Sequence, residues 1–224
     1  MISVIIPVKN AENTIKQSIQ SVIDQNVNDI EILCIVNGTT DNTENKIKEL
    51  NDERIKIFHS SPGIVPALNL GLKESRGDLI ARQDADDIWH NNKLIKQVEY
   101  LNLNQEIDIL GTQLKVVDQN NNFLYNTSYP LSHDLIAKEM LSGSNSIGHP
   151  SVIFRKRILE KCAGYFDLFN LAEDFDLWMR CLPWFKLSNL SEALVTYKHV
   201  PNPTYNPNIP RSLATWYKII YGVE

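Results

Sequence analysis

The first hundred residues alternate short apolar runs with amphipathic segments, and polar turns separate them. Four runs have the length and β-branched content of buried strands: residues 3–8, 30–36, 54–59 and 79–83. Three intervening segments space their apolar residues as helices do: residues 13–23, 41–50 and 65–74. This alternation predicts an α/β fold with a mostly parallel central sheet flanked by helices. Because ligands bind beyond the carboxyl ends of such strands, the loops after Val8, Val36 and Gln83 are expected to open on one side.

Local signals predict where individual helices begin and end. Asn13 is a typical N-cap for the first helix, in which Ile15, Ile19 and Val22 share one face. Gly77 is expected to end the third helix.

The pattern becomes mixed after the fourth strand. The expected elements are a helix over 93–103, a hairpin made of 107–117 and 123–126, a strand over 151–154 and a helix over 174–182. Four prolines between Pro201 and Pro210 predict an extended connector. A last helix, over 211–221, carries Trp216 next to basic residues; docking on its own domain and contact with a membrane surface or a partner both remain open.

Composition excludes several classes of protein. The net charge of -5 and the absence of a basic run argue against a nucleic-acid-binding protein. The sequence has no basic leader with a cleavage site and no transmembrane segment, which would need about 18 apolar residues, so a cytoplasmic location is expected. The three cysteines form no Cys-x-x-Cys pair and are expected to be reduced core thiols.

A cluster of carboxylates ends the fourth predicted strand. Asp84, Asp86 and Asp87 follow the apolar run directly, and burying such charges without a cation costs several kcal/mol each. Because a strand alternates faces, Asp84 and Asp86 are expected to point to the same side and offer the hard oxygen ligands that Mg²⁺ or Mn²⁺ accepts beside a phosphate. The alternative interpretation is a turn followed by a helix that Asp87 caps.

Six segments of the chain match one family in order and spacing. They are residues 3–12, 36–41, 67–71, 76–87, 149–155 and 172–180. The fourth segment contains Asp84-Ala85-Asp86-Asp87, and the sixth contains Glu173-Asp174. Together they resemble the family-2 glycosyltransferases of the GT-A fold, over about residues 2 to 198. The resemblance implies a GT-A domain over 1–200, with a nucleotide-binding half (1–104) and an acceptor-binding half (105–200), followed by a connector and helix over 201–224.

The resemblance also implies an activity and a set of site residues. The activity would be transfer of a single sugar, with inversion, from a nucleoside diphosphate donor to an acceptor hydroxyl on a glycan or another molecule. Asp86 would bind Mn²⁺ or Mg²⁺, and Asp174 would be the base, next to Glu173. The nucleotide would contact Pro7, Val8, Asn10, Glu12, Asn37, Asn69, Arg82 and Asp84, and the acceptor would contact His149 and Trp178.

The residue types agree with this chemistry, although each of these residues could instead have a purely structural role. Adjacent carboxylates repel, so the pKa of Glu173 or Asp174 should be raised, as suits a base; the pair could also simply complement a helix dipole. Arg82 can pair with Asp84 or reach a phosphate. Asn10 and Asn69 could be cap or turn residues.

The sequence departs from the family pattern at the loop after the second strand. Asn37 stands where the family commonly has an Asp that contacts uracil; its amide can still meet that base, so a UDP-sugar is expected. A catalytically inactive sugar-nucleotide binder, and a phosphatase with an Asp nucleophile, are the alternatives. The donor sugar, the acceptor, the linkage and the oligomeric state are not predicted.

Overall fold

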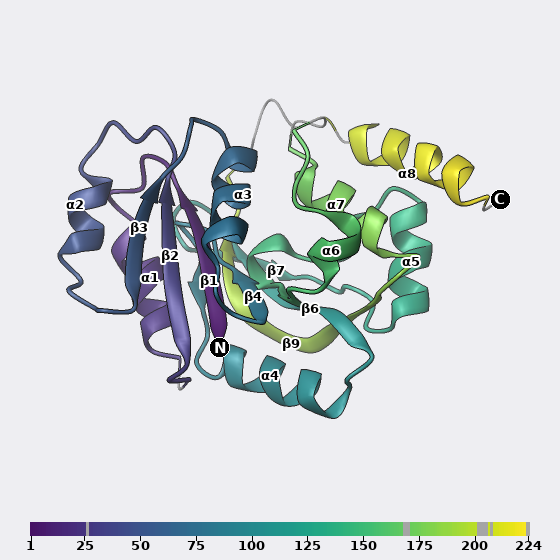
Figure 1. Cartoon of the computed structure of the whole chain (residues 1–224), viewed down its shortest axis with the longest axis horizontal. Helices are drawn as coiled ribbons and strands as arrows, with labels where there is room; N and C mark the ends of the chain where they lie inside the picture. Colours follow the sequence, from purple (N-terminus) through teal and green to yellow (C-terminus); the bar gives the residue numbers. More distant parts are fainter. Residues whose placement is uncertain (26, 168–170, 201–205, 207, 223–224) are drawn as a thin grey trace.

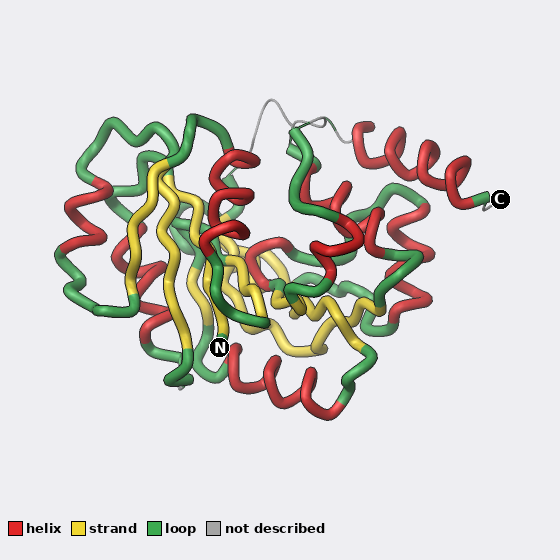
Figure 2. The backbone as a smooth tube through the Cα atoms, in the orientation of Figure 1, coloured by secondary structure: helices red, strands yellow, loops and turns green. Residues whose placement is uncertain are grey.

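The computed structural model describes residues 1–25, 27–167, 171–200, 206 and 208–222. Its strands form one curled nine-stranded sheet in the order β3-β2-β1-β4-β8-β6-β9-β5, with β7 paired to β6 (Figure 1, Figure 2). Helices cover both faces. The α/β fold class predicted from the alternation is confirmed.

The front half is a parallel β/α unit. Its strands are β1 (Ile2–Val8), β2 (Ile30–Val36), β3 (Ile55–His59) and β4 (Leu79–Arg82), and its helices are α1 (Ile15–Ile23), α2 (Thr43–Lys48) and α3 (Ile64–Glu74). Alternate β1 residues face opposite layers: Ile5 packs with the α3 layer, and Val4 and Ile6 pack with the α1 layer. Gly71 lets α3 approach closely, because a Cβ there would collide with Ile5. The carboxyl ends of β1, β2 and β4 therefore lie at one edge.

The back half extends the same sheet with mixed strand directions. Its elements are β5 (Ile88–Trp89), α4 (Lys93–Leu103), β6 (Ile107–Val117), β7 (Phe123–Asn126), α5 (His133–Leu141), a 3-10 turn (His149–Ser151), β8 (Ile153–Arg155), α6 (Ile158–Cys162), α7 (Glu173–Cys181), β9 (Lys186–Lys198) and α8 (Asn208–Tyr221). β8 runs antiparallel to β4 and β6, while β9 is parallel to β6. The mixed second half predicted from the sequence is confirmed.

Several expected helix and strand ends are wrong. Thr14, not Asn13, stands at the N-cap of α1, without a side-chain cap. α3 ends at Glu74 as predicted, but Gly77 does not end it: Gly77 meets the backbone of β1, where a Cβ would lie 2.7 Å from Ser3 N. Asp87 precedes β5 rather than a helix, so it caps none.

Further differences concern the back half and the tail. The strand expected from residue 151 begins at Ile153, because a 3-10 turn occupies the preceding residues. Most of the predicted connector lies outside the described residues. The cysteines are free and buried, as expected. No helix in the described ranges combines the length and apolar character needed to cross a membrane.

Candidate active site

The loops after β1 and β2 are joined by their own side chains. The Thr40 backbone N–H donates to Asn10 Oδ1 (2.8 Å), and the Asn42 N–H donates to Glu12 Oε2 (3.0 Å). Asn10 has a left-handed backbone with φ of 48°. The predicted nucleotide residues Asn10 and Glu12 thus hold the two loops together, and Asn37 is buried where β2 ends.

Residues 84–87, which carry the three carboxylates, form a turn, and two polar side chains bind its backbone. β4 ends at Arg82, so the expected strand alternation does not reach Asp84 and Asp86. Ser18 Oγ on α1 donates to the Asp84 carbonyl (2.6 Å), and Gln83 Nε2 donates to the Asp87 carbonyl (2.8 Å). Both bonds fix the backbone and leave the Asp side chains free to take different directions.

The three carboxylates of this turn have different partners. Asp84 forms an ion pair with Arg82, whose guanidinium is buried. Asp87 is fully buried; its Oδ1 accepts the Lys198 backbone N–H (2.9 Å) and thereby joins the turn to the end of β9. Burial and the charges of Asp84 and Asp86 raise the pKa of Asp87 well above its usual range. Asp87 therefore organises the turn from inside.

Asp86 lies at an open cavity and forms no ion pair with another described residue. It lines a cavity of about 360 Å³ with Pro7, Lys9, Asp84 and Lys198, at the edge where β1 and β4 end. Partial burial, and then the charge of Asp84, raise the pKa of Asp86, while Arg82 and Lys198 lower it. The two neighbouring negative charges of Asp84 and Asp86 favour binding of a further cation.

The donor set suits a divalent ion that is completed by a ligand. Among the described residues, no group of three or more His, Cys, Asp or Glu side chains is arranged around a common metal position. Asp84 is paired with Arg82 and Asp87 with the β9 backbone, so Asp86 is the carboxylate available. Mg²⁺ and Mn²⁺ accept one or two carboxylates when phosphate oxygens and water supply the rest. The residues present fit such an ion.

A second acidic pair lies at the start of α7. Asp174 Oδ2 accepts from Asn145 Nδ2 (2.8 Å), and Asp174 Oδ1 accepts from the Phe175 N–H (2.7 Å). Glu173 is the more buried of the two, and its Oε2 has no partner among the described residues. Burial, and then the charge of Asp174, raise the pKa of Glu173 to about 7; burial raises that of Asp174. The raised pKa expected for this pair is confirmed in direction.

Arg82 connects the two acidic groups electrostatically. Its positive charge lowers the pKa of Asp86 on one side and those of Glu173 and Asp174 on the other. Its Nε has no hydrogen-bond partner among the described residues, although the residue is only 5% exposed. The ion pair with Asp84 expected from the sequence is present, and the unpartnered N–H leaves capacity for an anion.

Asn69 has a role that the sequence did not indicate. Its Nδ2 donates to the Tyr165 carbonyl (2.8 Å), and its Oδ1 accepts the Tyr165 N–H (2.9 Å). Gly164 permits this close approach, because a Cβ there would collide with Asn69 Oδ1. Asn69 is neither a cap nor a turn residue; it fixes the segment that precedes the acidic pair.

Replacing Asn69 by Ala should therefore affect stability rather than nucleotide affinity. Losing both bonds to a partly buried backbone is expected to cost about 1–3 kcal/mol in the free energy of unfolding, measured with urea. Titration with UDP should give an unchanged Kd. Asn69→Asp should lose as much stability or more, because a carboxylate oxygen would replace the Nδ2 donor and face the Tyr165 carbonyl oxygen; a weaker Kd at unchanged stability would instead make Asn69 a nucleotide ligand.

The two predicted acceptor residues lie in the core. Trp178 has no exposed surface, and its ring packs edge-on against Phe154 and His149. His149 is 8% exposed, and its Nε2 lies 3.0 Å from the Tyr165 hydroxyl. A sugar could stack on Trp178 only if this core opened, so the structure favours a role in core packing for Trp178 and a structural role for His149.

Sequence reasoning did not identify three residues at the site. Lys198 lines the cavity from the end of β9, Asn145 binds Asp174, and Tyr165 binds His149. None of the three lies within the six segments that match the family. The order of the motifs gave no indication of these long-range contacts.

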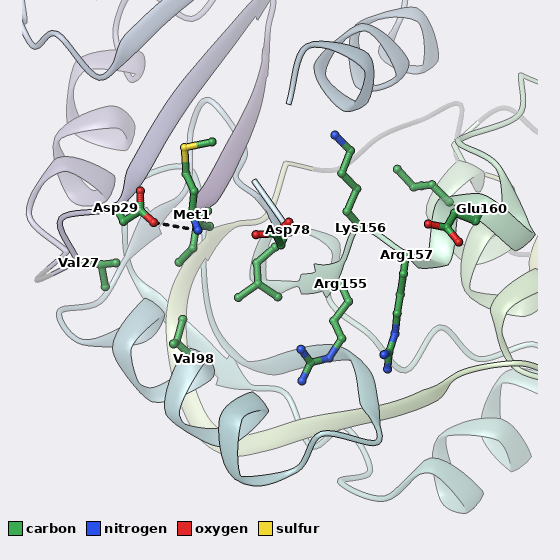
Figure 3. Close-up of a pocket in the computed structure, with 12 residues that line it drawn as sticks. Met1, Val27, Asp29, Asp78, Val98, Arg155, Lys156, Arg157 and Glu160 are labelled. Atoms are coloured by element: carbon green, nitrogen blue, oxygen red, sulfur yellow. Dashed lines mark ion pairs between the residues drawn. The ribbon is translucent and has the colours of Figure 1, made fainter. Parts of the chain in front are cut away.

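A larger cavity, of about 890 Å³, lies at the opposite end of β1 and β4 (Figure 3). Its basic side chains are already used: Arg155 donates to the Leu101 and Ile107 carbonyls, Lys156 to that of Ser75, and Arg157 to Asp108. These groups tie the base of the fold together, and the site residues lie at the other edge of the sheet.

A model of glycosyl transferase family 2 matches residues 3–163 of the chain. The chain belongs to this family. It is 32% identical over 225 residues to the O-antigen biosynthesis glycosyltransferase WbnJ of Escherichia coli, covering 97% of this chain and 85% of that protein. It is 30% identical over 201 residues to the E. coli UDP-Glc:alpha-D-GlcNAc-diphosphoundecaprenol beta-1,3-glucosyltransferase WfgD, covering 89% and 76%. The family assignment confirms a glycosyltransferase and overturns the phosphatase alternative.

Solved structures confirm the GT-A fold. S. aureus TarS 1-349 in complex with UDP-GlcNAc matches with a TM-score of 0.76 at 20% identity, over 97% of this chain and 65% of that one. The mannosyltransferase PcManGT of Pyrobaculum calidifontis, in complex with GDP-Man and Mn²⁺, matches with a TM-score of 0.69 at 15% identity, over 96% and 69%. The chain thus spans about two thirds of each of these two structures.

Proposed function

We propose that this family-2 glycosyltransferase moves a single sugar from a UDP-sugar to an acceptor hydroxyl, with inversion and with a divalent metal. The observation that carries the proposal is the position of Asp86, a carboxylate with a raised pKa that lines a cavity at the ends of β1 and β4. Cavities of a few hundred Å³ are the usual size of small-ligand sites.

The donor side needs a clamp for a diphosphate. Asp86 would hold Mn²⁺ or Mg²⁺, which when bound neutralises charge on the leaving diphosphate. Asp84 and Arg82 flank it, and the free Nε–H of Arg82 suits a phosphate oxygen. The loops that contain Pro7, Val8 and Asn10 would hold the nucleoside.

The acceptor side needs a proton acceptor. Asp174, with Glu173 beside it, would take the proton of the acceptor hydroxyl as that oxygen bonds to the anomeric carbon and the bond to the diphosphate breaks. One such displacement inverts the anomeric carbon. The hydrogen bond from Asn145 orients Asp174 for this step.

Uracil is the proposed base of the donor nucleotide. The buried Asn37 offers an amide donor and acceptor at the end of β2, which suits the uracil edge. The solved relative TarS carries UDP-GlcNAc, whereas PcManGT carries GDP-Man, so the nucleotide is the point to test first.

Thermal unfolding with nucleotides tests the donor proposal. UDP with Mn²⁺ should raise the melting temperature, and at a concentration of about 100 times Kd the stabilisation should be about 2.7 kcal/mol. UDP without metal and GDP with Mn²⁺ are the matched controls and should stabilise less. Failure of every nucleoside diphosphate to stabilise the protein would contradict the proposal.

Donor hydrolysis separates an enzyme from an inactive sugar-nucleotide binder. An active enzyme should slowly hydrolyse a bound UDP-sugar in the presence of Mn²⁺, with water in place of the acceptor, and so release UDP. Stabilisation by UDP without any release of UDP from a panel of UDP-sugars would favour the inactive binder, which the presence of both acidic groups argues against.

A further inference from the structure

The last helix, α8, is anchored on the helix that carries the proposed base. Its buried residues Leu213, Ala214 and Tyr217 pack in the core layer that contains α7. The Tyr217 hydroxyl donates to Asp176 Oδ1 (2.7 Å), and the Tyr221 hydroxyl donates to the Met179 carbonyl (2.8 Å). These contacts fix which side of α8 faces inward.

The opposite side of α8 is apolar and exposed. Trp216 is 52% exposed, Ile219 75% and Ile220 52%; these three residues are called the α8 outer face below. A groove of about 350 Å³, lined in part by Ile209, Leu213 and Trp216, continues this face toward the start of the helix. Large apolar side chains gathered on one exposed face mark a contact surface.

The charges along α8 indicate what this surface contacts. Arg211 and Lys218 are seven residues apart, so they lie on the same edge of the helix, two turns from each other. The helix contains no Asp or Glu, although the whole chain has a net charge of -5. At about 100° per residue, Arg211 and Lys218 lie about 140–160° round the helix from Trp216, so α8 has cations on one side and the apolar outer face on another. A helix with Trp and Ile on one face and only basic charges on the other has the composition of helices that lie in the surface of an anionic membrane.

A second copy of the chain suits this face less well. A two-fold contact through this face would bury the apolar residues of both copies, but it would offer Arg211 and Lys218 no anionic partner from α8, which has no Asp or Glu. An anionic lipid surface instead satisfies both the apolar and the basic groups.

We propose that the α8 outer face docks the enzyme on an anionic lipid bilayer. Trp216, Ile219 and Ile220 enter the headgroup boundary, and Arg211 and Lys218 contact lipid phosphates. Because α8 packs on α7, docking holds the acceptor half of the enzyme next to the membrane.

Vesicle co-sedimentation of the whole chain tests the proposal. The protein should sediment with phosphatidylcholine vesicles that contain phosphatidylglycerol and much less with phosphatidylcholine alone, and added salt should weaken binding. The triple variant Trp216→Ser, Ile219→Ser, Ile220→Ser should lose binding about tenfold or more. Arg211→Glu with Lys218→Glu should remove the preference for the anionic lipid.

A control variant tests whether replacing any exposed apolar residue by Ser weakens vesicle binding. Leu103, at the end of α4, is 85% exposed, and Leu103→Ser should bind vesicles as the wild type does. Circular dichroism and Mn²⁺-dependent UDP stabilisation should be unchanged in every variant, so the result does not depend on the proposed activity. Wild-type binding to neither vesicle, or equal binding of the triple variant, would overturn the proposal; so would a triple variant that changes only self-association in sedimentation velocity.

Discussion

Asp86→Ala is expected to lower metal-dependent turnover by about 10²–10³-fold, as loss of a group that stabilises developing charge does in other enzymes. Asp86 is the carboxylate that lines the proposed donor cavity without an ion pair to another described residue. Stabilisation by UDP should become independent of Mn²⁺. The measurements are steady-state donor hydrolysis and thermal unfolding with and without the metal.

The same substitution should not destabilise the protein. The folded pKa of Asp86 is raised by burial and by the charge of Asp84, so its contribution to stability is greatest below its unfolded pKa and falls as pH rises through the folded pKa. Without metal, Asp86→Ala should therefore be at least as stable as the wild type at pH 8. Asp78→Ala, at the other end of β4, is the matched control and should keep full activity. If Asp86→Ala retains metal-dependent hydrolysis, the metal lies elsewhere.

The regular elements were predictable because their signals are local. The observed bounds of β2, α4, β6 and β7 equal the predicted ones, since each has a continuous apolar run or a clear helical period. The start of α1, the end of β4 and the role of Gly77 were missed, because tertiary contacts decided them. At Gly77, for example, the constraint is the β1 backbone rather than a helix end.

The role of a site residue was predictable where the residues of its own motif determine it. It was not predictable where contacts with distant parts of the chain determine it. Asp84 and Asp87 look alike in sequence; their difference comes from Arg82 on one side and from the backbone of Lys198, 111 residues away, on the other. Trp178 was a candidate for sugar stacking because one-dimensional spacing cannot tell an exposed indole from a core one. Its placement required knowing which layer packs on α7.

Asp174→Asn is expected to lower glycosyl transfer by about 10²–10⁴-fold, the usual contribution of a general base. The amide is nearly the same size, and its oxygen can still accept the Phe175 N–H, so the fold and UDP binding should remain. Transfer to an acceptor should fall much more than UDP affinity, which separates proton transfer from donor binding. Asp167→Asn, at an exposed position nearby, is the matched control. Full transfer by Asp174→Asn would place the base elsewhere.

The pH profile gives a second test of the same pair. Burial and the charge of Asp174 raise the pKa of Glu173 to about 7, so above that pH a second negative charge stands beside Asp174 and makes Asp174 a stronger base. The value of kcat/KM should therefore rise with pH through about 7 and level off above it. Glu173→Gln removes the group that titrates there, so the rise should move to lower pH. If the pH profile of Glu173→Gln is unshifted, another group titrates near pH 7. The raised pKa of Glu173 then has no effect on proton transfer by Asp174.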